Sequence, residues 1–116
     1  MEERMPFLYQ LIHETDWDVA RPTGEVKPAS LGEEGYIHCF GSKEQLERAA
    51  NRFYPGQRGM MVLELDTAMI SSPLKHESNR SGEIYPRIYG PLNVEAVVRV
   101  QEMSIDDAGR LYLTDE

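Results

Sequence analysis

Short apolar runs of strand length recur along the chain and are separated by turn-forming residues. Residues 7–12 are apolar on both faces and residues 60–65 are strongly apolar, which predicts strands in the interior of a sheet. Residues 94–100 alternate, and their even-numbered members are expected to share one face of a further strand. The other predicted strands are shorter and cover residues 36–40, 74–77 and 111–113.

The alternation within residues 36–40 assigns their side chains to two faces of a strand. Ile37 and Cys39 are expected to face the core, and Tyr36, His38 and Phe40 to share the opposite face. The pattern therefore predicts an imidazole that lies between two aromatic rings.

A short helix is predicted after the first strand. Thr15 is a suitable cap for a helix that turns Trp17 inward, and Pro22 and Gly24 mark its end. The next segment, residues 27–31, is expected to be an irregular connector.

A second and longer helix is predicted from residue 42 to the Tyr-Pro-Gly sequence that ends it at residues 54–56. Ser42 followed by Gln45 matches a capping box. The apolar positions that follow recur with helical spacing and are Leu46, Ala49, Ala50 and Phe53.

Several short strands with two early helices predict an α+β domain with a bent, largely antiparallel sheet. A chain of 116 residues is long enough for one hydrophobic core but not for two. We therefore expect a single domain over residues 1–116, with its core at about 7–102 and a C-terminal tail at 103–116.

The formal net charge is −8, from 20 acidic and 12 basic residues. Such a charge repels phosphate backbones, so nucleic acid is not an expected partner. No apolar stretch approaches the ~20 residues of a membrane helix, and the first residues lack the features of a signal peptide. A lone cysteine suits a reducing compartment, so a cytoplasmic location away from membranes is expected.

The candidate metal ligands have none of the spacings that are typical of zinc sites, and no metal site is predicted. His38 and Cys39 are adjacent, but strand alternation directs them to opposite faces. Cys39 is therefore expected to be a buried and inert thiol rather than a nucleophile with His38 as its base.

Two segments contain the candidate site, residues 35–39 and residues 85–92. His38 can present a nitrogen in an aromatic-walled cleft, or it can be a core histidine that bonds a carbonyl. Glu77 precedes a polar, turn-rich segment at 78–82 that predicts an exposed, mobile loop. Its carboxylate can meet a substrate hydroxyl, or it can be an exposed glutamate without a role.

The second segment carries two tyrosines and an arginine among turn-forming residues. Tyr85 and Tyr89 can stack on a planar ring, and Arg87 offers a planar cation for phosphate or carboxylate. The alternative is a rigid connector whose tyrosines complete the core. Gly90 and Pro91 are assigned a structural role in the turn.

These sequences resemble a bacterial family known as domain of unknown function 952. The resemblance extends from Tyr9 to about Val100 and depends on the order and spacing of several motifs. They are Tyr9, Trp17 and Gly24, then Pro-Ala-Ser-Leu at 28–31, Glu-Gly-Tyr-Ile-His-Cys at 34–39, Ala-Asn-Arg-Phe-Tyr at 50–54, Leu-Glu-Leu-Asp at 63–66, Glu77, and residues 85–92.

That family is similar to the ADP-ribosyltransferase fold, a split and bent antiparallel sheet that clamps NAD in active relatives. The resemblance implies a polar contact to the adenosine side from the first strand, aromatic rings around nicotinamide, and a carboxylate on the ribose that supports an oxocarbenium-like transition state. The residues that match these roles are Gln10 on the first strand, His38 on the cleft wall, Glu77 as the carboxylate, and Tyr36, Tyr85 and Tyr89 for stacking.

Many relatives carry histidine where this chain has Gln10 and Arg87. Glutamine forms hydrogen bonds but carries no charge. Two functions are therefore expected: a cleft that binds NAD or a related nucleotide and transfers or hydrolyses ADP-ribose, or a non-catalytic module that binds another small molecule or a peptide.

Overall fold

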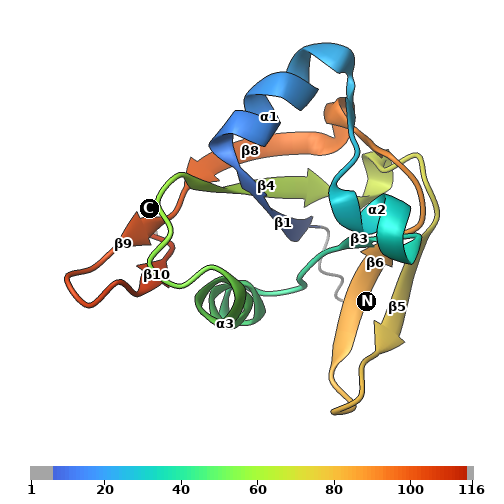
Figure 1. Ribbon diagram of the computed structural model, residues 1–116. Helices are drawn as coiled ribbons and strands as arrows, with labels where there is room; N and C mark the ends of the chain where they lie inside the picture. Colours follow the sequence, from blue (N-terminus) through green and yellow to red (C-terminus); the bar gives the residue numbers. More distant parts are fainter. Residues whose placement is uncertain (1–6, 115–116) are drawn as a thin grey trace, which may run out of the picture.

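The computed structural model describes residues 7–114 and confirms a mixed α+β fold with antiparallel sheets (Figure 1). One sheet consists of β1 (Phe7–His13), β4 (Met60–Asp66) and β8 (Val97–Glu102), in the order β1-β4-β8. The central position of β4 agrees with its apolar sequence, since both of its faces are covered.

A second antiparallel sheet has the order β3-β6-β5. It contains β3 (Ile37–His38), β5 (Leu74–Ser78) and β6 (Ile84–Ile88). An isolated bridge between Tyr9 and Phe40 joins the two sheets through backbone hydrogen bonds of 2.9 and 2.8 Å. The strands of the two sheets run in different directions, so the bridge lies where the combined sheet bends (Figure 1).

Two further strand pairs complete the framework. β2 (Glu25–Val26) pairs with β7 (Leu92–Asn93), and β9 (Ser104–Ile105) pairs with β10 (Leu111–Tyr112). β9 and β10 form a hairpin beside the third helix (Figure 1).

The first helix, α1 (Glu14–Ala20), buries Trp17 as the sequence predicts. The prediction that Thr15 caps it is wrong, because His13 is the cap and its Nδ1 atom accepts from the Thr15 amide at 3.2 Å. A short 3-10 helix, η1 (Arg21–Thr23), follows and ends at Gly24, whose φ of 87° favours glycine.

The predicted connector at 27–31 is wrong, because the chain forms a helix there, α2 (Ala29–Glu34). Gly35 ends this helix in the left-handed conformation, with φ 87°. The prediction missed a helix of only six residues whose N-cap, Pro28, offers no side-chain acceptor.

The longer helix, α3 (Lys43–Phe53), is confirmed. Ser42 caps it by accepting from the Gln45 amide at 3.1 Å. The Gln45 Oε1 atom accepts from the Gly41 amide at 3.0 Å, one residue before the position that a standard capping box uses.

The predicted strand at 94–100 is correct only in its second half. Residues Val94–Ala96 form a 3-10 helix, η3, and β8 begins at Val97. The expected shared face is wrong, since Ala96 is fully buried whereas Val98 is 50% exposed. Another 3-10 helix, η2 (Thr67–Met69), follows β4.

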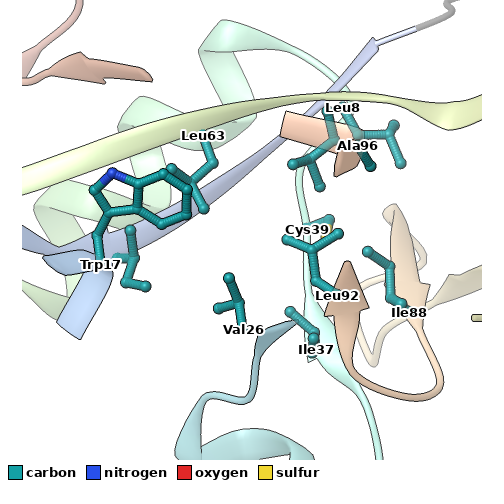
Figure 2. Close-up of a cluster of buried hydrophobic side chains, with 11 residues drawn as sticks. Leu8, Trp17, Val26, Ile37, Cys39, Leu63, Ile88, Leu92 and Ala96 are labelled. Atoms are coloured by element: carbon teal, nitrogen blue, oxygen red, sulfur yellow. The ribbon is translucent and has the colours of Figure 1, made fainter. Parts of the chain in front are cut away.

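Two hydrophobic clusters cover the two faces of the β1-β4-β8 sheet. Figure 2 shows the first cluster, in which Cys39 is packed among residues from several strands. The second cluster lies under α3 and includes Met103, Leu111 and Leu113 from the segment predicted as a C-terminal tail. Among the described residues, no helix is long and apolar enough to cross a membrane.

Candidate functional site

The β3-β6-β5 sheet gathers most of the predicted site residues on one face. Its register pairs His38 on β3 with Arg87 on β6, and Arg87 with Lys75 on β5. Glu77 on β5 pairs with Tyr85 on β6. Directly paired residues point to the same side of a sheet, so side chains from three strands meet here.

Aromatic rings and a guanidinium group pack together on this face. The rings of Tyr36 and His38 meet edge to face with centroids 5.0 Å apart, and those of Tyr36 and Tyr89 lie 5.4 Å apart. The Arg87 guanidinium lies 4.4 Å from the centre of the Tyr36 ring. A cation over a tyrosine face contributes about 0.5–2 kcal/mol, so this contact fixes the orientation of both side chains.

Glu77 is the acceptor at the centre of this group. Its Oε1 atom accepts a hydrogen bond from the Tyr89 hydroxyl and another from Arg87 Nη1 at 3.2 Å. The hydrogen bond from Tyr89, helped by the hydrogen bond and charge of Arg87 and the charge of Lys75, outweighs desolvation and lowers the pKa of Glu77. Glu77 is therefore an anion at neutral pH, and the same hydrogen bond raises the pKa of Tyr89.

His38 has a carboxylate partner that the sequence analysis did not identify. Its Nε2 atom lies 2.5 Å from Oε1 of Glu34, the last residue of α2. Both side chains remain about half exposed. His38 is therefore not a core histidine that bonds a carbonyl, but a surface imidazole oriented by the helix that precedes its strand.

Tyr85 lies on the same face, but its hydroxyl donates to Glu83 Oε1 at 2.8 Å. Gln45 Nε2 donates to the other Glu83 oxygen at 3.1 Å, and Arg48 also pairs with it. The hydrogen bond from Tyr85, followed by the one from Gln45, lowers the pKa of Glu83. This network anchors the β5–β6 hairpin to α3, and the Tyr85 ring packs edge to face on Phe40.

The structure does not bring Gln10 together with the others. Gln10 lies two residues from both Leu8 and Ile12 on β1 and shares their face of the strand, which carries the first hydrophobic cluster. Ile37 and Cys39 belong to the same cluster, and His38 points to the opposite side of their strand. Gln10 is 2% exposed, and its Oε1 atom accepts no hydrogen bond within the described part of the chain.

The predicted residues thus divide into three groups. Tyr85 is adjacent to the cluster but bonds Glu83, and Gln10 lies apart in the core. The remaining five form what we call the Glu77 cluster, namely Tyr36, His38, Glu77, Arg87 and Tyr89.

Two residues at this face were not identified from the sequence. Glu34 lies four positions before His38, a spacing that acquires meaning only once α2 is known. Lys75 lies two positions before Glu77, and its Nζ atom is 5.0 Å from the centre of the Tyr89 ring. Strand alternation could have placed Lys75 and Glu77 on one face.

An open groove of about 810 Å³ lies elsewhere, between α3 and the loop before β10. Arg48, Arg52 and residues 108–110 line part of it. None of the predicted site residues contributes to this groove, so the Glu77 cluster is a surface feature of a sheet and not the wall of the groove.

Cys39 is buried in the first cluster, where desolvation raises its pKa to about 12. A thiol with that pKa is almost entirely protonated at neutral pH and is a poor nucleophile. Across residues 7–114, no group of three or more histidine, cysteine, aspartate or glutamate side chains could hold a metal ion.

Comparison with known proteins identifies a family and a solved relative. The family described as "Protein of unknown function (DUF952)" matches residues 11–100. The crystal structure of protein CC0527 from Caulobacter crescentus is similar, with a TM-score of 0.82 and 27% sequence identity over 90% of this chain and 92% of that one. Its solution NMR structure gives a TM-score of 0.78 and 28% identity over 90% of each chain. No curated protein matches this sequence significantly.

Proposed function

The chain belongs to the DUF952 family, and from this premise and the geometry of the Glu77 cluster we propose that it binds NAD or a related nucleotide on the exposed face of the β3-β6-β5 sheet. The observation that carries the proposal is an ionised carboxylate held between a tyrosine hydroxyl and a guanidinium, beside two tyrosine rings.

Each part of the cluster suits one part of such a ligand. The rings of Tyr36 and Tyr89 offer faces on which a nicotinamide or adenine ring stacks. Glu77 is already ionised and accepts a hydrogen bond from a ribose hydroxyl. The His38 ring meets the Tyr36 ring edge to face and lines the same surface.

The resemblance to the ADP-ribosyltransferase fold, which the sequence motifs suggest, leads us to propose a reaction as well as binding. In that chemistry the bond between nicotinamide and ribose breaks, and positive charge develops on the ribose. A fixed carboxylate near the ribose stabilises this charge without having to reorganise. Two three-stranded antiparallel sheets joined at Tyr9 and Phe40 are consistent with the split sheet of those enzymes.

Calorimetric titration with NAD and with ADP-ribose tests the proposal. Wild-type protein is expected to bind both ligands and to show a thermal shift with each. Glu77→Gln, which keeps the side-chain shape but removes the charge, should weaken binding by about tenfold, the cost of losing a charge-assisted hydrogen bond. Glu102→Gln, an exposed carboxylate on β8, is the control. No heat and no thermal shift with millimolar ligand would overturn the proposal.

A non-catalytic binding module is the second candidate. It is favoured because the groups that catalysis would use are already paired, Glu77 with Arg87 and His38 with Glu34. The two candidates separate in a time course of nicotinamide release. Ligand binding without release supports the module. Steady release by the wild type that disappears in Glu77→Gln eliminates it.

A further inference from the structure

Three basic side chains form a row across the β3-β6-β5 sheet. His38, Arg87 and Lys75 occupy one line of the register, one residue on each strand. Neighbouring strands lie about 4.8 Å apart, so adjacent members of the row are within reach of one small ligand. The row stands out in a chain whose net charge is −8.

Carboxylates near the row pair with two of its three members. Glu34 pairs with His38, and Glu77 pairs with Arg87. Lys75 is exposed and makes no ion pair within 4.0 Å among residues 7–114. Its Nζ atom lies 5.0 Å from the centre of the Tyr89 ring, and its charge contributes to the lowered pKa of Glu77. The surplus positive charge is therefore at the β5 end of the row.

Arg87 adds unused hydrogen-bonding capacity beside Lys75. Its Nη1 atom contacts Glu77, but its buried Nε atom has no hydrogen-bond partner among the described residues. A buried donor without an acceptor is destabilising, and such donors are rare enough in folded proteins to require an explanation. An anionic group that draws the guanidinium from Glu77 would provide the missing acceptor.

We infer that Lys75 and Arg87 bind the phosphate groups of the ligand, so that the site selects nucleoside diphosphates and dinucleotides over nucleosides and free bases. This inference rests on the proposed function and deepens it. The Tyr89 ring contacts both Lys75 and the Tyr36 ring. Tyr89 therefore connects the proposed phosphate position, at Lys75, to the proposed position of the base, at the two tyrosine rings. Glu77 repels phosphate but accepts hydrogen bonds from hydroxyl groups. The ribose is therefore expected next to Glu77, and the phosphate groups next to the basic side chains.

The test compares four probes: adenosine, AMP, ADP and inorganic pyrophosphate. Each is titrated into the wild type, into Lys75→Gln, and into Arg99→Gln, an exposed arginine on β8 that controls for the change in net charge. Wild-type affinity should rise by at least about tenfold from adenosine to ADP. Lys75→Gln should lose about tenfold for ADP and pyrophosphate with adenosine unchanged, and salt should weaken ADP binding less than in the wild type.

The possible failures are distinguishable. The phosphate inference is overturned if the wild type binds adenosine and ADP equally well, or if Lys75→Gln binds ADP as tightly as the wild type does. Either result leaves nucleotide binding intact. Binding of pyrophosphate that requires Lys75, without binding of any nucleotide, overturns the proposed function and supports an anion site. Absence of binding for all four probes overturns the phosphate inference, and absence of NAD binding as well overturns the proposed function.

Discussion

The hydroxyl of Tyr89 donates a hydrogen bond to the Oε1 atom of Glu77 and so ties the residue after β6 to the neighbouring strand β5. The bond favours the ionised form of the carboxyl group and the neutral form of the phenol. It is the largest cause of the lowered pKa of Glu77 and of the raised pKa of Tyr89. The pKa of each side chain therefore depends on the presence of the other.

Removing the charge of Glu77 should change the titration of Tyr89. In Glu77→Gln we expect the pKa of Tyr89 to fall toward its ordinary value of 10.0, because the phenolate no longer faces a carboxylate. Carbon NMR of the tyrosine rings against pH measures the change, with Tyr89→Phe to assign the signal. Glu102→Gln should leave the titration as it is in the wild type, and an unchanged Tyr89 pKa in Glu77→Gln contradicts the described hydrogen bond.

Glu83 should make stability depend on pH in the acid range. Its pKa in the folded state is below the ordinary value of 4.5, chiefly because Tyr85 donates to it. The folded protein then binds fewer protons than the unfolded chain, so the stabilisation is present above about 4.5 and is lost as pH falls through the lower folded-state pKa.

Urea unfolding at a series of acid pH values measures this effect. Glu83→Gln should show a shallower loss of stability in that range than the wild type. Tyr85→Phe removes the largest cause of the shift and should reproduce part of the effect. If the three proteins lose stability in parallel, the network between the hairpin and α3 does not hold the carboxylate ionised.

Local signals account for the elements that the sequence predicted well. α3 has a capping serine and four apolar positions in helical spacing, and all of that information lies within the helix. α2 has neither a capping side chain nor a repeat of the apolar period, since it spans six residues. The sequence predicts strand for η3 because its three residues begin with a valine and run directly into the valines of β8, so a 3-10 turn leaves no distinct pattern there.

The candidate site was predictable where it depends on alternation along one strand. Tyr36 and His38 share a face for that reason, and their rings are in contact. The meeting of Glu77 with Arg87 depends instead on the register of the β5–β6 hairpin, which the sequence of its loop does not specify. The face of Gln10 was undetermined because both faces of β1 are covered by core.

Alkylation should distinguish the buried Cys39 from a reactive thiol. Iodoacetamide is expected to label the native protein slowly, because the thiol is 1% exposed and burial raises its pKa to about 12. Labelling should become fast in urea concentrations that unfold the chain. Fast labelling under native conditions would mean that the first hydrophobic cluster opens readily.

Substitution of Gln10 tests whether the first strand takes part in ligand binding. The Gln10 amide is buried with an oxygen that has no described partner, and an apolar group of similar shape removes that deficit at little cost. The free energy of unfolding of Gln10→Met is therefore expected to be no more than about 1 kcal/mol below that of the wild type, or to exceed it. The variant should bind NAD with unchanged affinity. Leu8→Ala, on the same face of β1, should lose about 2–5 kcal/mol and shows that the unfolding assay detects changes in this core. If Gln10→Met keeps its stability but loses affinity for NAD, Gln10 contacts the ligand as the family resemblance implies, and the ligand then extends past the β3-β6-β5 face into the core side of β1.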